Sequence, residues 1–183
     1  LLDGGLPCAE ITFRTAAAPE AIALMTAECP DVLVGAGTVM TVDQAKMAAE
    51  AGVKFVVTPG FDGDVVDWCI ANDMPVTPGV VTPTEINMAL KKGLNVVKFF
   101  PAEASGGVRT LKAVAAPYQG VKFIPTGGIS AANLSDYLSL ASVHACGGSW
   151  MVKKELISAG EFGQISAMAA EAVALAAQIR EGA

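Results

Sequence analysis

The sequence predicts an α/β fold in which parallel strands alternate with helices and close into a (β/α)8 barrel. Short β-branched runs are each followed by a segment with helical punctuation, and most runs end in Gly or Pro. Successive runs end about 20 to 25 residues apart, which is the length of one strand–loop–helix unit. Strands that are regularly followed by helices form a parallel sheet, either open or closed.

Seven runs are expected to be strands, and two observations favour the closed form. The runs are AEITF, DVLVGAG, KFVVTPG, PVTPGV, NVVKFFP, KFIPTGG and VHACGGSW. Polar residues recur at their carboxyl ends, as in barrel enzymes that gather their chemistry from several strands. No GxGxxG opens the first helix, so the dinucleotide-binding open sheet has no support.

Two of the intervening helices have clear boundaries. In TPTEINMALKKG, Thr82 is the expected N-cap, Glu85 closes a capping box and Gly93 stops the helix. In TVDQAKMAAEAG, Thr41 and Gly52 take the equivalent places. These boundaries support a regular succession of strands and helices.

A barrel of this kind has eight strands, one more than the sequence supplies. The chain starts at LLDGG without a methionine, a pattern typical of a last helical turn and its glycine stop. We therefore expect the first strand and helix to be missing, roughly 25 to 30 residues by the repeat length. In this interpretation residues 1–183 form a single barrel domain.

Composition restricts the class of protein. Apolar residues make up 52% of the 183 residues and charged ones 16%, which excludes a disordered chain. The net charge of −6, without a basic stripe, argues against a nucleic-acid partner. The Ala-rich segment ISAMAAEAVALAAQIR predicts an amphipathic helix packed on a core, so we expect no membrane partner. Cysteines without a CxxC pair are typical of core residues in a reducing compartment, and we expect a cytoplasmic protein.

Side chains alternate between the two faces of a strand, and in two of the predicted strands this alternation places an amine and a carboxylate on the face away from the helices. In AEITFR, Glu10 and Arg14 share a face, while Ile11 and Phe13 share the opposite, helix-facing side. In NVVKFF, Lys98 is the one charged residue of an apolar run. We expect Glu10, Arg14 and Lys98 to point into the same barrel interior.

Two interpretations of Lys98 remain open at this point. It forms a structural ion pair with Glu10 or reaches water at the barrel mouth. Alternatively it is a nucleophile, because burial and a nearby Arg14 lower the pKa of its amine and leave more neutral amine to attack a carbonyl. Glu10 raises that pKa, yet a carboxylate beside an imine-forming lysine shuttles protons.

Paired glycines in PTGGIS and CGGSW follow the last two strands, and each pair is expected to open a helix. Such loops point backbone N–H groups at an anion, and phosphate-binding barrels use the loops after strands seven and eight. The predicted phosphate cradle consists of Gly127, Gly128, Gly147, Gly148 and the hydroxyl of Ser149. Thr38 in GAGTV either forms a tight turn or binds a carboxylate or carbonyl oxygen at the mouth. His144, the single histidine, is expected to be packed rather than a ligand, so no metal is expected.

The motifs AEITFRT, VGAGTV, TPTE, VVKFFPAE, PTGGIS and GGSWMV, in this order, resemble those of 2-keto-3-deoxy-6-phosphogluconate (KDPG) aldolases. Some members of that family also act on 4-hydroxy-2-oxoglutarate (KHG). The resemblance covers essentially the whole chain, except that the strand and helix that open the family's barrel are absent. It implies a homotrimeric class I aldolase, a carbon–carbon lyase, on a (β/α)8 TIM barrel.

The resemblance also implies residue roles. Lys98 matches the imine-forming lysine and Glu10 the general acid/base, while Arg14 and Thr38 match residues that hold the substrate carboxylate. The matched pocket-wall residues are Pro59 and Phe100, and those of the phosphate site are Gly127, Gly128 and Ser149. Thr126 precedes the paired glycines, where phosphogalactonate aldolases tend to have valine.

The implied reaction cleaves KDPG to pyruvate and glyceraldehyde 3-phosphate, and in the second activity KHG to pyruvate and glyoxylate. It needs no cofactor beyond the covalent imine through Lys98. The expected partners are a phosphorylated 2-keto acid and pyruvate. The alternatives are a 2-keto-3-deoxy-6-phosphogalactonate aldolase, an isomerase or decarboxylase on a phosphate-binding barrel, and a non-catalytic phosphate-binding barrel.

Overall fold

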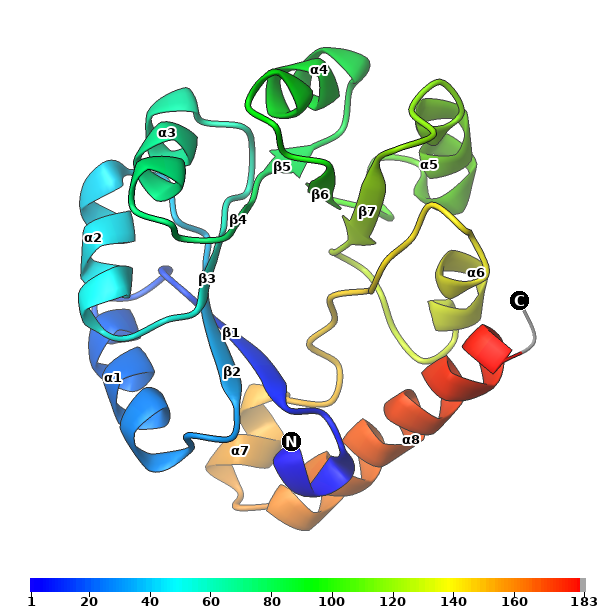
Figure 1. Cartoon of the computed structure of the whole chain (residues 1–183). Coiled ribbons are helices and arrows are strands. Elements are labelled where there is room, and N and C mark those ends of the chain that lie inside the picture. Colours follow the sequence, from blue (N-terminus) through cyan, green and yellow to red (C-terminus); the bar gives the residue numbers. More distant parts are fainter. Residues whose placement is uncertain (182–183) are drawn as a thin grey trace. The chain divides into compact units, whose positions relative to one another are not determined.

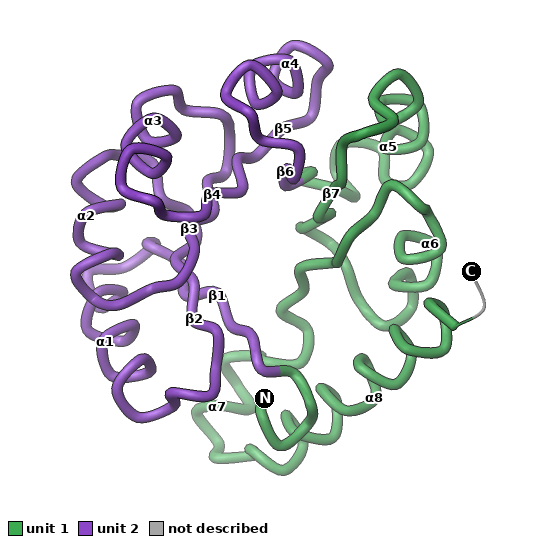
Figure 2. The backbone as a smooth tube through the Cα atoms, viewed as in Figure 1, with its two compact units in different colours: residues 1–6, 99–183 green, residues 7–98 purple. Residues whose placement is uncertain are grey.

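The computed structural model describes residues 1–181 as an α/β protein that divides into two compact units. Unit 2 is Pro7–Lys98, and unit 1 consists of Leu1–Leu6 and the chain from Phe99 onward (Figure 2). The expectation of a single domain over the whole chain stays a prediction.

Unit 2 contains a parallel sheet with the strand order β1-β2-β3-β4. Its strands are β1 (Cys8–Thr12), β2 (Leu33–Gly37), β3 (Phe55–Val57) and β4 (Val76–Thr77). The helices α1 (Ala18–Glu28), α2 (Val42–Glu50) and α3 (Gly63–Ala71) lie along one side of this sheet (Figure 1). The unit continues with β5 (Gly79–Val80), α4 (Pro83–Lys91) and β6 (Val96–Phe99), whose last residue belongs to unit 1.

The predicted helix boundaries in unit 2 are confirmed. The Thr41 hydroxyl accepts a hydrogen bond from the Gln44 amide at 3.2 Å and caps α2. At α4, the Thr82 amide donates to the Glu85 carboxylate at 2.8 Å as part of a capping box. Such caps satisfy amides that the first helical turn leaves unpaired, which stabilises a helix by about 1 kcal/mol.

The run PVTPGV is two strands rather than the one expected. Pro78 lies between β4 and β5 and has no N–H to donate to a ladder. Its carbonyl still accepts a hydrogen bond from the Lys98 amide at 2.9 Å. The proline therefore interrupts the strand while keeping it beside β6.

The core of unit 2 lies between the sheet and its helices. Phe13 is buried in this core and Ile11 packs against it, which leaves the other face of β1 to Glu10. The buried members of the core are Phe13, Ala18, Ile22, Val34, Ala36, Val39, Ala45, Ala48, Val53, Val56, Val65, Val66, Cys69 and Val76. The expected alternation along β1 is thus observed.

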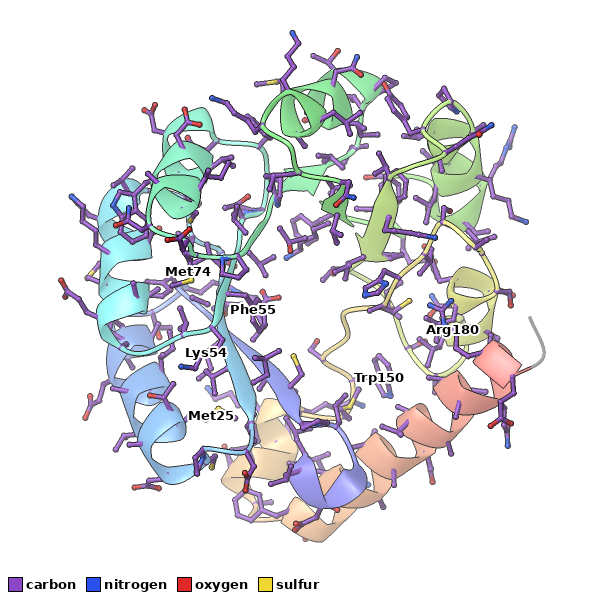
Figure 3. The ribbon with its side chains drawn as sticks, in the orientation of Figure 1. Met25, Lys54, Phe55, Met74, Trp150 and Arg180 are labelled. Carbon is purple, nitrogen blue, oxygen red and sulfur yellow. The ribbon has the colours of Figure 1, made fainter. Side chains whose placement is uncertain are left out.

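Up to residue 181, unit 1 contains one named strand and five helical segments. They are η1 (Leu2–Gly4), α5 (Gly107–Ala115), β7 (Lys122–Pro125), α6 (Leu134–Leu138), α7 (Lys154–Ser158) and α8 (Phe162–Glu181). The η1 turn packs on α8, where a Cβ added to Gly4 would lie 2.7 Å from the Ala169 Cβ. Gly5 follows η1 with a φ of 77°, so LLDGG is a helical turn with a glycine stop, as predicted. Near the other end of α8, Arg180 donates to the Val143 carbonyl at 2.8 Å (Figure 3).

Two expectations for unit 1 were wrong. The run VHACGGSW forms no strand but two isolated parallel bridges, from Val143 to Phe123 and from Gly147 to Thr126. The low strand propensity of glycine is the physical reason. The helices expected directly at the paired glycines begin later, α6 at Leu134 and α7 at Lys154. Before α6, the Asn133 side chain accepts the Ser130 amide at 2.8 Å across the turn that leads into the helix.

Other side chains also differ from expectation. Cys69 is buried, but Cys8 is exposed and Cys29 and Cys146 are partly exposed, so a core position holds for Cys69 alone. His144 is exposed rather than packed.

Residues 1–181 contain no group of three or more His, Cys, Asp or Glu placed to hold a metal ion. Within the same residues, α8 is the one helix long and apolar enough to cross a membrane, a property that core helices of soluble proteins share.

Candidate active site

Unit 2 holds a lysine and a carboxylate that meet from two strands. The Nζ atom of Lys98 on β6 lies 3.8 Å from Oε1 of Glu10 on β1. Lys98 is 5% exposed, whereas the Glu10 side chain is 31% exposed. The amine is therefore largely withdrawn from water, with a carboxylate beside it that still reaches solvent.

This environment lowers the pKa of Lys98 below its ordinary value of 10.5. Burial is the largest cause, because a charged amine loses hydration, and the positive charge of Arg14 acts in the same direction. Glu10 opposes both, since its negative charge favours the ammonium form. The net effect is a larger fraction of neutral, nucleophilic amine near neutral pH.

The Lys98 titration gives a first prediction. We expect the Cε resonance of Lys98, in lysine-selective ¹³C-labelled protein, to titrate below pH 10.5, and Lys98→Arg assigns the signal. Glu10→Gln should lower this pKa further and Arg14→Gln should raise it. Because the unfolded chain binds more protons between the two pKa values, folding stability should rise with pH across that window. A Lys98 titration at or above 10.5 would contradict the burial argument.

Glycines in β2 create the space that the carboxylate occupies. A Cβ added to Gly37 would lie 1.8 Å from Oε1 and 2.7 Å from Cγ of Glu10, so the Glu10 side chain would have to move. A Cβ at Gly35 would lie 2.2 Å from the ring of Phe55, which Figure 3 labels on β3. The GAG sequence is thus required for the packing of the neighbouring strands and for the position of Glu10.

Gly37→Ala tests this requirement. We expect it to destabilise the protein by about 1–3 kcal/mol, the usual cost of overpacking, and to displace the Glu10 carboxylate. Thermal unfolding gives the first quantity and the Lys98 titration the second. Gly63→Ala is the matched control, because a Cβ there meets nothing within 4 Å. Equal stability of the two variants would refute the close packing of Gly37.

Backbone strain marks the end of β2. Thr38 has a φ of 56°, the left-handed region that threonine rarely adopts. Arg14, after β1, donates through Nε to the Thr12 hydroxyl at 3.1 Å. A hollow of about 180 Å³ lies next to Thr38, lined by Val39, Met40, Pro59, Gly60, Phe61 and Asp62.

Thr58 is a structural residue of this region that sequence reasoning missed. It is completely buried and donates to the Gly60 carbonyl at 2.6 Å. Its oxygen also accepts the Gly79 amide at 3.3 Å. Thr58 therefore ties the Pro59 loop to β5, and the repeated TPG sequence was the available signal.

Unit 1 holds the first glycine loop. Gly127 and Gly128 have φ values of 98° and 82°. The carbonyls of Thr126 and Gly127 accept the amides of Ala102 and Glu103 at 2.9 and 3.1 Å. Within residues 1–181 the Gly127 and Gly128 amides have no hydrogen-bond partner. The loop therefore presents two successive unpaired backbone donors, and they lie before the first residue of α6, Leu134, rather than in that helix.

The second glycine pair lies beside the first loop. The Gly147 amide donates to the Pro125 carbonyl at 2.9 Å, and a Cβ at Gly147 would lie 2.6 Å from the Thr126 hydroxyl. A Cβ at Gly148 would meet the ring of Trp150 at 1.8 Å (Figure 3). Ser149 is exposed. Both glycines are thus needed where the chain passes Thr126 and Trp150.

The predicted residues therefore fall into two groups. In unit 2 the structure joins Glu10 and Lys98, adds the charge of Arg14, and places Pro59 at the hollow next to Thr38. In unit 1 the ring of Phe100 lies 3.3 Å from a Cβ built on Gly127, and Thr126, Gly127, Gly128 and Gly147 form contiguous loops.

Comparison with known proteins shows the family of this chain. The chain matches the KDPG and KHG aldolase family over residues 1–168. It is 52% identical over 168 residues to the 2-dehydro-3-deoxy-phosphogluconate aldolase of Treponema pallidum, covering 92% of this chain and 80% of that relative.

Solved structures of the same family are similar to this chain. The KDPG aldolase of Zymomonas mobilis ZM4 with 3-phosphoglycerate superimposes with a TM-score of 0.88 at 39% identity, covering 93% of this chain and 80% of that one. The KDPG aldolase of Legionella pneumophila, with pyruvate captured as a covalent carbinolamine, superimposes with a TM-score of 0.89 at 38% identity. The match covers 92% of this chain and 82% of that one. The protein is thus an α/β enzyme of the TIM-barrel type, in the lyase class. It belongs to the KDPG and KHG aldolase family.

Proposed function

We propose that the protein is a class I aldolase that cleaves KDPG to pyruvate and glyceraldehyde 3-phosphate. The observation that carries this proposal is the buried Lys98 amine, with a lowered pKa, 3.8 Å from the Glu10 carboxylate. A neutral amine forms an imine with a ketone, and an adjacent carboxylate transfers the protons that the reaction moves. Membership of the family supports the same reaction.

In the proposed mechanism the neutral Lys98 amine attacks C2 of the substrate, and loss of water gives a protonated imine. Glu10, through a water molecule, takes the proton from the C4 hydroxyl, and the C3–C4 bond breaks as its electron pair moves to the imine nitrogen. Glyceraldehyde 3-phosphate leaves. Glu10 returns a proton to C3 of the enamine, and hydrolysis of the imine releases pyruvate and frees Lys98.

The remaining site residues are proposed to bind and orient the substrate. Arg14 and Thr38 hold the carboxylate, because a guanidinium and a hydroxyl both donate hydrogen bonds to it. Pro59 and Phe100 are proposed to make apolar contacts with the substrate. The phosphate is bound by the amides of Gly127, Gly128 and Gly148 with the hydroxyl of Ser149. The Gly147 amide, which the sequence also placed in the cradle, already donates to the Pro125 carbonyl, so Gly147 contributes space and not a donor. Fixing both ends of the substrate positions the reacting bond over Lys98.

We further propose that the protein works in the cytoplasm as a homotrimer, cleaves KHG as a second substrate, and requires no metal or cofactor. The pyruvate captured as a covalent carbinolamine in the Legionella relative supports covalent chemistry. Thr126, before the paired glycines, is proposed to favour the gluconate over the galactonate substrate.

Trapping tests this function. Borohydride with pyruvate should reduce the imine and add one reduced pyruvate to Lys98, located by peptide mass spectrometry. KDPG should release pyruvate faster than the phosphogalactonate isomer, measured by a lactate dehydrogenase coupled assay. A phosphate-binding isomerase or a non-catalytic barrel gives no adduct at Lys98, and that result would refute the proposal.

A further inference from the structure

Glu103 lies directly on the glycine loop of unit 1. It ends the FPAE sequence that follows β6, and its amide donates to the Gly127 carbonyl at 3.1 Å. A Cβ added to Gly128 would lie 2.6 Å from Cγ of Glu103 and 2.7 Å from its Cβ. The aliphatic part of Glu103 therefore packs against the backbone of Gly128 and limits how that glycine turns.

The Glu103 carboxylate is itself fixed, by a residue 34 positions later in the chain. The hydroxyl of Tyr137 on α6 donates a hydrogen bond to Oε1 of Glu103, and Tyr137 is completely buried. Burial, followed by this carboxylate, raises the pKa of Tyr137, so the phenol keeps the proton that it donates. Glu103 is exposed overall, so the hydrogen bond from Tyr137, and not burial, fixes its carboxylate.

Asn133 holds the same loop through another contact. Its Nδ2 donates to the Gly128 carbonyl at 3.0 Å, while its Oδ1 accepts the Ser130 amide at 2.8 Å. The carbonyls of Thr126, Gly127 and Gly128 are thus all occupied by protein donors. In a trans peptide the C=O and the N–H of the next residue point in opposite directions. Because Ala102, Glu103 and Asn133 bind the carbonyls from one side, the unpaired amides of Gly127 and Gly128 point to the other side.

We propose that Glu103, anchored by Tyr137, is a positioning residue that holds the Gly127 and Gly128 amides in the orientation that binds the substrate phosphate. This proposal rests on the phosphate site of the proposed function. A carboxylate that touched the phosphate would repel it, so Glu103 acts through the loop and not by contact. The hydrogen bond from Tyr137 keeps that negative charge in place.

The test compares Glu103→Ala, Glu103→Gln and Tyr137→Phe. Glu103→Ala removes both the aliphatic part of the side chain that packs on Gly128 and the hydrogen bond from Tyr137. The KM for KDPG and the Kd for inorganic phosphate should therefore rise about tenfold. The change in kcat should stay within about twofold, because loop binding is separate from chemistry at Lys98. Glu103→Gln keeps the aliphatic part of the side chain and an oxygen that accepts from Tyr137, so it should bind phosphate as the wild type does. Tyr137→Phe should weaken phosphate binding, as Glu103→Ala does.

Phosphate binding is measured from the concentration dependence of thermal protection by inorganic phosphate. Borohydride trapping with pyruvate, which has no phosphate, should proceed at the wild-type rate in all three variants. Glu171→Ala, an exposed carboxylate on α8, is the matched control. If Glu103→Ala does not fold, Tyr137→Phe and Glu103→Gln carry the comparison.

Two failures are distinguishable. A wild-type protein protected by phosphate, with both Glu103→Ala and Tyr137→Phe equally protected, would overturn the role of Glu103 alone. A wild-type protein that phosphate does not protect would overturn the phosphate site itself and this role with it. In either case the pyruvate adduct at Lys98 reports separately on the imine chemistry.

Discussion

Lys98→Ala is expected to abolish aldol cleavage. Loss of a nucleophile costs on the order of 10⁶ in turnover in enzymes where it has been removed, so we expect kcat/KM for KDPG to fall by at least about 10⁴-fold. Lys98→Arg should be as inactive, because a guanidinium stays protonated and does not attack a carbonyl. Coupled pyruvate release measures the activity, and borohydride trapping should give no adduct in either variant.

Lys98→Arg separates the two interpretations of this lysine. A structural ion pair with Glu10 needs only a positive charge, so an active Lys98→Arg would refute the nucleophile and favour the ion pair. Lys54→Ala is the control, since Lys54 is exposed on the same unit (Figure 3). It should retain both the activity and the adduct at Lys98. Circular dichroism confirms that each variant is folded.

Glu10→Gln should slow turnover by about 10²- to 10⁴-fold, the usual contribution of a positioned acid or base. The amide has nearly the same shape but takes no proton from the C4 hydroxyl. Pyruvate should still be trapped on Lys98, because the substitution removes an influence that raises the pKa of the amine. The measurements are kcat for KDPG and the concentration of pyruvate that gives half-maximal trapping.

The control for this substitution is Glu20→Gln, an exposed carboxylate on α1. It should leave both measurements unchanged. An unchanged kcat in Glu10→Gln would reassign the acid/base role to another group. Equal losses in trapping and turnover would mean that Glu10 acts mainly on the position of Lys98.

Local sequence patterns predicted much of the unit 2 geometry. Alternation along β1 and β6 predicted that Glu10 and Lys98 lie on facing sides, because side-chain direction in a strand has a period of two. The caps at Thr41 and Thr82 were equally local, since each involves residues three positions apart. The assignment of catalytic roles to these residues stays a prediction.

Contacts between distant segments were outside the reach of such patterns. The hydrogen bond from Tyr137 to Glu103 joins residues 34 positions apart, and no periodicity relates them. The break at Pro78 is local by contrast, because proline has no N–H to donate to a ladder, and the proline within PVTPGV was the available signal.

The withdrawal of Lys98 from water restricts how this chain can be engineered. A redesign that maximises thermal stability would replace a desolvated amine by leucine or methionine, because apolar side chains suit the interior of β6 better. Such a replacement would remove the amine that we propose attacks the ketone of the substrate. Stabilising libraries for this barrel should therefore hold position 98 constant and seek their gains on the exposed helical faces.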